Sequence, residues 1–96
     1  MNLSTSSVMN VAGREVVIRE LTVEVGRLII KPNPNPDFLG DVLFKDLRLW
    51  DLTHLTNLTA EEMEGMYPSD LSKVIEACKA KNPDFFEMLA RAFPKP

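Results

Sequence analysis

The sequence predicts a single α+β domain, mainly α, in which an N-terminal β-hairpin precedes a bundle of about four short helices. β-Branched residues that alternate with polar ones occur near the N-terminus, which is typical of strands. Capping residues and prolines divide the second half into apolar segments with helical spacing. The chain has 96 residues, of which 45% are hydrophobic and 26% charged, as in ordinary globular domains. We expect residues 1–7, which are small and polar, to be disordered, and residues 8–96 to form one domain.

The hairpin is expected over residues 8–19. Val16 and Ile18 occupy alternate positions of its second strand and therefore share one face of it. Gly13 supplies the positive φ that a tight turn between the strands requires. An isolated hairpin is marginally stable in water, so this one must pack against the helices that follow.

Residues 22–31 are compatible with either a helix or a strand. Thr22 is a suitable N-cap for a short helix, whereas Gly26 and the β-branched residues suit a strand equally well. Residues 31–36 contain three alternating prolines, which remove backbone donors and favour extended geometry in the residues before them. We interpret this segment as a stiff linker inside one domain, because neither side of it could fold alone.

The helical part is expected over residues 37–93, and its first helix is expected to run from Asp37 to Leu49. This segment carries apolar residues at helical spacing, namely Leu39, Val42, Leu43 and Leu47. Three aromatic residues widen the apolar arc. The core is the favoured place for Phe38, Phe44 and Trp50, and a surface covered by another protein is the alternative.

Three further helices begin at recognisable capping residues. Thr59 and Glu62 form a capping box, in which each side chain bonds the backbone amide of the other residue. Pro68 suits the first turn of the next helix. Its inward positions follow at i, i+3, i+4 and i+7, and they are Leu71, Val74, Ile75 and Cys78. Asn82 as N-cap and Pro83 in the first helical position are expected to start the last helix.

The charge balance argues against nucleic acids and membranes as partners. The chain has 14 acidic and 11 basic residues, a formal net charge of −3. Nucleic-acid binding depends on lysines and arginines that neutralise phosphates, and anionic membrane surfaces also attract basic segments. No apolar stretch approaches the roughly 20 residues that a membrane-spanning helix requires.

Few side chains could carry chemistry, and we expect no enzyme, no cofactor and no metal site. The single cysteine, Cys78, cannot form an internal disulfide, which fits a reducing compartment, and no signal peptide is evident. The expected location is therefore the cytoplasm. Cys78 is expected to be buried, and the single histidine, His54, to lie at the surface or at a helix cap. Zinc needs three or four ligands, and the acidic residues within 61–64 lack the spacing of a calcium loop.

The last helix carries more apolar surface than one amphipathic stripe needs. Apolar side chains cover most of its circumference, and they are Phe85, Phe86, Met88, Leu89, Ala92 and Phe93. Burial of one phenylalanine is worth about 1.5–3 kcal/mol, so solubility disfavours three of them in water. Two explanations stay open. Either this is a central helix packed on several neighbours, or part of its arc, for instance Phe85, Met88 and Ala92, is a docking surface for another protein.

Several short motifs resemble those of the small tail assembly chaperones of long-tailed bacteriophages. They are the runs Gly13–Thr22, Leu52–Glu62, Pro68–Leu71 and Asn82–Phe86, in that order. The resemblance covers about residues 8–93. It implies a non-catalytic role in the cytoplasm of a bacterial host, in which the protein binds the apolar, helical tape-measure protein and keeps it soluble. It further implies the tail tube protein as a second partner, and a homo-oligomer stays open.

The alternative is a small helix-turn-helix regulator or an antitoxin-like module, with residues 59–66 and 69–81 as its two helices. The second helix would expose Asp70, Ser72, Lys73, Glu76 and Lys79. Two acids in this set repel phosphates, and it contains no arginine to bind guanine. An enzyme would need a partner chain to complete its active site.

Overall fold

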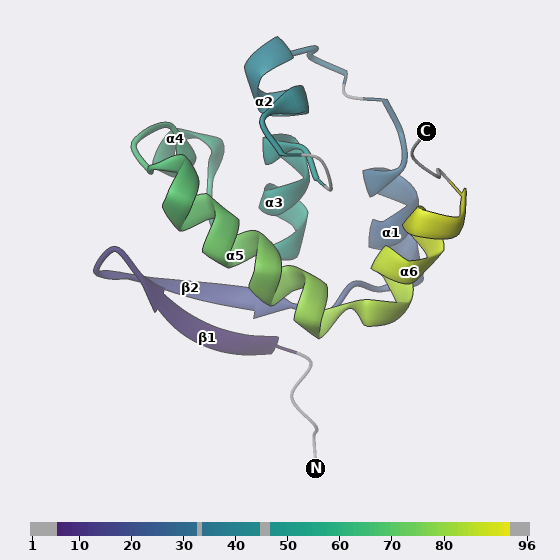
Figure 1. The fold of residues 1–96 in the computed structure, drawn as a ribbon, viewed down its shortest axis with the longest axis horizontal. Coiled ribbons are helices and arrows are strands. Elements are labelled where there is room, and N and C mark those ends of the chain that lie inside the picture. Colours follow the sequence, from purple (N-terminus) through teal and green to yellow (C-terminus); the bar gives the residue numbers. More distant parts are fainter. Residues whose placement is uncertain (1–5, 33, 45–46, 93–96) are drawn as a thin grey trace.

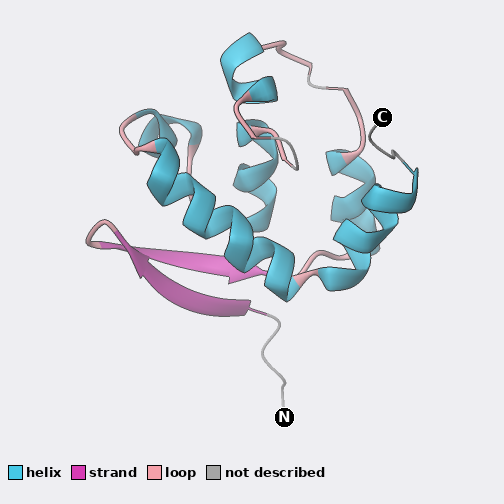
Figure 2. Cartoon of the chain, viewed as in Figure 1, coloured by secondary structure: helices cyan, strands magenta, loops and turns pink. Residues whose placement is uncertain are grey.

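The computed structural model describes residues 6–32, 34–44 and 47–92 and confirms the predicted α+β, mainly α, fold (Figures 1 and 2). Within these residues six helices follow the hairpin, in place of about four. In chain order the elements are β1 (Ser6–Val11), β2 (Arg14–Arg19), α1 (Val23–Ile29), α2 (Phe38–Val42), α3 (Leu49–Leu55), α4 (Ala60–Glu64), α5 (Pro68–Lys81) and α6 (Pro83–Ala92).

The predicted hairpin is present, and it begins at Ser6. The disorder expected for residues 6 and 7 is therefore wrong, while residues 1–5 lie outside the described part of the chain. β1 and β2 pair in antiparallel register up to Val11 and Arg14, so the loop has two residues, Ala12 and Gly13. Both have positive φ, 54° and 77°, as a type I′ turn requires.

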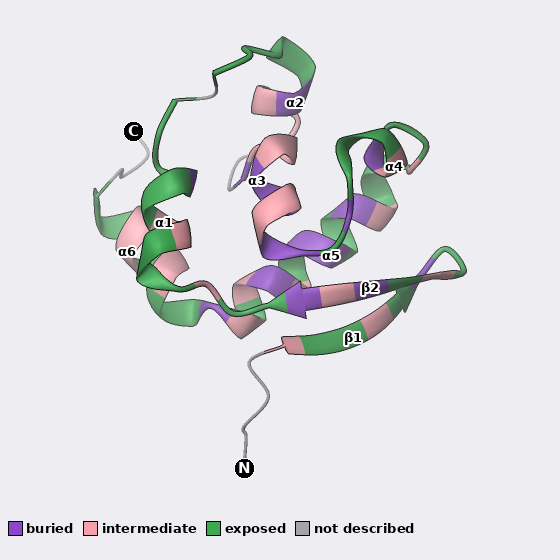
Figure 3. Ribbon diagram, turned by 180° about the vertical axis from the view of Figure 1, so that it is seen from behind, coloured by how far each residue is buried: buried purple, intermediate pink, exposed green. Residues whose placement is uncertain are grey.

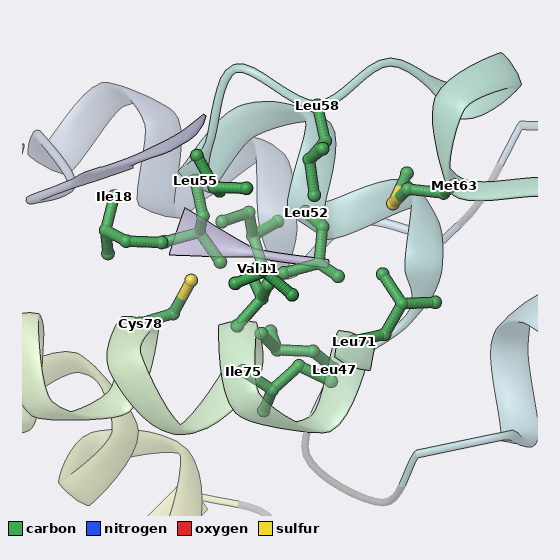
Figure 4. Close-up of a cluster of buried hydrophobic side chains, with 13 residues drawn as sticks. Val11, Ile18, Leu47, Leu52, Leu55, Leu58, Met63, Leu71, Ile75 and Cys78 are labelled. Atoms are coloured by element: carbon green, nitrogen blue, oxygen red, sulfur yellow. The ribbon is translucent and has the colours of Figure 1, made fainter. Parts of the chain in front are cut away.

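The core lies between the hairpin, α5 and α3. α5 lies across the hairpin (Figure 1), and the four inward positions predicted for it are all buried. Figure 4 shows Ile75 and Cys78 of α5 facing Leu52 and Leu55 of α3. Cys78 is 0% exposed, which confirms its expected burial, and desolvation raises the pKa of its thiol to about 12.

The ambiguous segment 22–31 contains a helix. The side chain of Thr22 accepts a hydrogen bond from the amide of Val25, 3.2 Å away, and so caps α1. This is the cap that the helical alternative for this segment predicted. Of the seven residues in α1, Ile29 alone is buried. Much of the surface of this short helix is therefore open to solvent.

The single helix expected from Asp37 to Leu49 is wrong, because the chain forms two helices there. Arg48 has extended backbone and starts α3 through Asp51, whose carboxylate accepts from the Arg48 amide at 3.0 Å and from its guanidinium at 2.8 Å. The guanidinium also donates to the backbone carbonyl of Ile29. A bond to a residue far away in the sequence thus helps to set where α3 begins.

α2 is a peripheral helix that buries only Gly40. Phe38 is 84% exposed, so the core position expected for it is wrong, and Leu39 and Val42 are exposed as well. Phe44 is half-buried and packs against the core, and Trp50 is half-buried. Of the other two residues predicted at helical spacing, Leu43 is half-buried and Leu47 is buried in the core, so the spacing does not correspond to one buried helix face.

The capping box that begins α4 is confirmed. The Glu62 amide donates to the Thr59 hydroxyl at 3.1 Å, and the Thr59 amide donates to the Glu62 carboxylate at 3.0 Å. The same carboxylate pairs with Arg14 of the hairpin at 2.9 Å. The hydrogen bond from the Thr59 backbone, helped by Arg14, lowers the pKa of Glu62. Pro68 is the first residue of α5, as predicted.

Candidate protein-binding groove

Asn82 joins two connections that are distant in the sequence. Its side-chain oxygen accepts from the Leu21 amide at 2.7 Å, and its side-chain nitrogen donates to the carbonyls of Arg19 at 3.0 Å and Cys78 at 3.1 Å. Asn82 is 5% exposed. We refer to this set of bonds as the Asn82 joint. As predicted, Asn82 directly precedes α6, Pro83 is its first residue, and the Asn82 carbonyl accepts a bond from the Phe86 amide. The Asn82 side chain bonds the three backbone groups instead of capping the helix.

α1 and α6 both begin at the Asn82 joint and run side by side away from it (Figure 1). They form the walls of a groove of about 420 Å³, which we call the α1–α6 groove. The two helices approach each other at Gly26, where an added Cβ would lie 3.4 Å from Cε1 of Phe85. The apolar lining of the groove comes from both helices and from the residue before α1. It includes Leu21, Val23, Ile30, Phe85 and Met88.

The residues predicted for a docking surface on the last helix divide into three groups. Phe85 and Met88 are half-buried and line the groove. Phe86 and Leu89 are also half-buried, and the Phe86 ring meets that of Phe85 edge to face at 5.4 Å. Ala92 is exposed, and Phe93 lies outside the described residues.

No residue of α6 between Pro83 and Ala92 is buried. Other elements do contain buried residues. Figure 3 shows them on α5, α3 and β2 and shows none on α6. A central helix packed on several neighbours would bury several side chains. The large apolar side chains of α6 are nevertheless half-buried, and Phe85 and Phe86 pack against the core, so α6 is neither a fully enclosed central helix nor a fully exposed one.

Charged side chains lie along the rim of the groove. Glu20, Lys81 and Asp84 lie at the end nearest the Asn82 joint, and Arg27 lies further along α1. In the described part of the chain none of these four has an ion-pair partner within 4.0 Å. Their charges are therefore free to meet a bound molecule.

The contribution of α1 to the groove was not predicted from the sequence. The short segment 22–31 could not be assigned to a helix or a strand, and nothing in it indicated that it lies beside the last helix. The one available signal is Gly26, because a glycine inside a helix often marks a close approach by another group. Here that group is the ring of Phe85.

The position of the His54 side chain also differs from the expectation. It is half-buried, its Nε2 atom is buried and has no hydrogen-bond partner among the described residues, and its ring meets Trp50 edge to face at 5.3 Å. The predicted surface or cap position is therefore wrong. Within the same residues no three carboxylate, thiol or imidazole groups gather as metal ligands would.

The proposed recognition helix of a helix-turn-helix corresponds to α5. Its Lys73 lies 4.0 Å from Asp70 and its Lys79 lies 3.6 Å from Glu76, so each lysine is next to an acid on the same helix. Phosphates are bound by cations whose charge is not already neutralised. The outer face of α5 is a poor surface for DNA for this reason.

No known protein family matches this chain. No curated protein and no solved structure matches it either. Across the described residues, no helix has the length and apolar character needed to cross a membrane.

Proposed function

We propose that this protein is a non-catalytic binding protein that holds an apolar helical segment of a partner protein in the α1–α6 groove. One observation carries the proposal. Apolar side chains of α1 and α6 line an open groove, while α6 itself buries none of its residues between Pro83 and Ala92. Contiguous exposed apolar surface of this kind typically marks an interaction site.

The shape of the groove favours a helix as its occupant. Two helices side by side present ridges of side chains with a furrow between them, and a third helix packs into such a furrow with its own apolar stripe. Val23 is 75% exposed and Ile30 is 52% exposed, and both line the groove. A partner that covers them removes apolar surface from water, which is the main favourable contribution to such binding.

The resemblance of the sequence motifs supplies the biological role. On this proposal the protein is a phage tail assembly chaperone that acts in the bacterial cytoplasm. Its client is the tape-measure protein, which it keeps soluble, and the tail tube protein is a further partner. The apolar groove is consistent with a client that is itself helical and apolar.

Gly26 offers a sharp test, because a side chain at this position points toward Phe85 and into the groove. The full chain, its Gly26→Leu variant and its Gly26→Ala variant would each be coexpressed with the tape-measure protein. We expect the natural protein and Gly26→Ala to raise the soluble fraction of the client and to copurify with it. Gly26→Leu, which fills the groove, is expected to do neither.

Gly26→Ala is the matched control, since its single methyl group reaches ordinary contact distance from Phe85 and leaves the groove open. Circular dichroism and thermal unfolding of the isolated variants check that both are folded. A client that copurifies equally with Gly26→Leu would overturn the assignment of the groove. No complex with any of the three proteins, together with salt-sensitive binding of duplex DNA, would favour the helix-turn-helix alternative.

A further inference from the structure

The rim of the α1–α6 groove differs in charge from one end to the other. At the end near the Asn82 joint, the rim carries two carboxylates, Glu20 and Asp84, and one ammonium group, Lys81, so acidic groups are in excess there. At the far end the rim carries Arg27, and the exposed Lys31 follows α1. The groove therefore has an acidic end and a basic end.

The order of contacts between the two helices fixes which end is which. Leu21, at the start of α1, bonds Asn82 at the start of α6. Gly26 lies against Phe85, and Ile30 and Met88 line the groove beyond them. α1 and α6 are therefore parallel, with their N-terminal ends at the acidic end of the groove.

We propose that the client helix binds antiparallel to α1 and α6, with a basic last turn beside Glu20 and Asp84 and an acidic first turn beside Arg27. This inference rests on the function proposed above. Helices commonly carry acids in the first turn and bases in the last, where each charge opposes the helix dipole. Such a helix meets opposite charge at both ends of the groove when it is antiparallel, and like charge at both ends when it is parallel.

The dimensions of α1 set the length of the segment that is held. Seven residues of α-helix span roughly 10 Å, so about two turns of the client lie in the groove. The partner is thus a helix with one apolar stripe at i, i+3, i+4 and i+7, flanked by acids before it and bases after it.

The α6 helix of a second copy is a poorer occupant. Its most extensive apolar helix is α6, but Phe85 and Phe86 of that helix already pack against their own core. The outward positions of α6 include Glu87 and Arg91, which form an ion pair at 3.6 Å. The apolar side chains of a second α6 therefore face its own groove and core, and its outward face is charged.

The orientation can be read with a synthetic peptide of about 14 residues that has glutamates in its first turn, leucines along one stripe and lysines in its last turn. A nitroxide is placed at one end or the other, and the ¹⁵N-labelled full chain is observed by NMR. With the nitroxide at the peptide's C-terminus, we expect broadening of the amide signals of Glu20, Thr22 and Asp84. With it at the N-terminus, we expect broadening at Arg27 and Ile30.

Charge reversal tests the cause of the orientation. In Glu20→Lys/Asp84→Lys, peptide affinity should fall by about three- to tenfold at low salt, and the difference should disappear at high salt. Glu61→Lys/Glu64→Lys is the matched control. It changes the net charge equally, also replaces an acid in a first helical turn, and lies on α4, which contributes nothing to the groove lining.

The outcomes distinguish a failure of the antiparallel orientation from a failure of the proposed function. The reversed broadening pattern, or equal losses in the two charge-reversal variants, would overturn the antiparallel orientation and leave the groove as the binding site. A peptide that binds elsewhere, or binds Gly26→Leu unchanged, would overturn both. Self-association of the unliganded protein that the peptide displaces would show that a second copy is the occupant and would likewise overturn the proposal.

Discussion

Ala12 has φ 54° in the type I′ turn of the hairpin, a left-handed conformation that costs an L-residue with a Cβ about 1–2 kcal/mol. Asparagine adopts this conformation more easily and is the preferred partner of glycine in such turns. We expect Ala12→Asn to raise the free energy of unfolding by about 0.5–1 kcal/mol, measured by urea denaturation. The same change at Ala80, which is exposed within α5, should lower it by about 0.5 kcal/mol. A loss of stability at both positions would show that Ala12 is not strained.

Cys78 links stability to pH in the alkaline range. Burial raises the pKa of its thiol from an ordinary value of 9.0 to about 12, so above pH 9 the unfolded chain loses this proton while the native chain keeps it. The stabilising contribution is therefore complete below pH 9 and is lost as pH rises toward 12. It falls by roughly 1.4 kcal/mol per pH unit at most.

The check is urea denaturation of the natural chain and of Cys78→Ala at about pH 8 and about pH 10. Other groups titrate in this range, but they are shared by the two proteins. We expect the natural chain to lose about 1 kcal/mol more than Cys78→Ala between the two pH values. Parallel losses would mean that the thiol ionises equally well in the folded state.

At the scale of single elements, the start of α3 depends on an ion pair whose carboxylate is buried and whose guanidinium is half-buried. Asp51 is 3% exposed and holds the backbone and guanidinium of Arg48, and Asp51 raises the pKa of that guanidinium further. Asp51→Ala leaves these donors without their acceptor and should lower the free energy of unfolding by about 3 kcal/mol in thermal or urea denaturation. Glu76→Ala, which breaks the exposed Glu76–Lys79 pair of α5, should change it by less than about 0.5 kcal/mol. Similar effects of the two changes would show that the Arg48–Asp51 pair has no special role.

Elements whose signals are local could be predicted from the sequence. The capping box of Thr59 and Glu62, the turn at Gly13 and the inward stripe of α5 all depend on residues a few positions apart. Their geometry follows from backbone and side-chain preferences alone. The same is true of the apolar character of α6.

Elements set by distant partners could not be predicted in this way. The break between α2 and α3 involves Arg48 and the carbonyl of Ile29, and the Asn82 side chain turns away from its own helix to bond Leu21. Neither partner can be identified from the spacing of residues. For the same reason half of the candidate site, the wall formed by α1, was missed, although the apolar residues of α6 were found.

At the scale of the whole molecule, stability is expected to be unevenly distributed. α5 buries four side chains in the core, whereas α2 buries only Gly40. In native-state hydrogen exchange, amides of α2 should exchange through local opening with little protection, and the central amides of α5 should exchange only on global unfolding. Low concentrations of urea should then accelerate exchange in α5 and leave α2 almost unaffected. Equal protection of the two helices would contradict this distribution.

The two walls of the groove are anchored differently. α1 is bonded at both ends, through Leu21 to Asn82 and through the carbonyl of Ile29 to Arg48. α6 is bonded to the rest of the fold at its first turn, and from there to Ala92 it has no fully buried side chain. A rotation of α6 about Asn82 would change the width of the groove and leave the hydrogen bonds that hold α1 intact, at the cost of the contacts of Phe85 and Phe86 with the core. If the groove binds a partner helix as proposed, the wall formed by α1 keeps its position while the wall formed by α6 adjusts to partner side chains of different size.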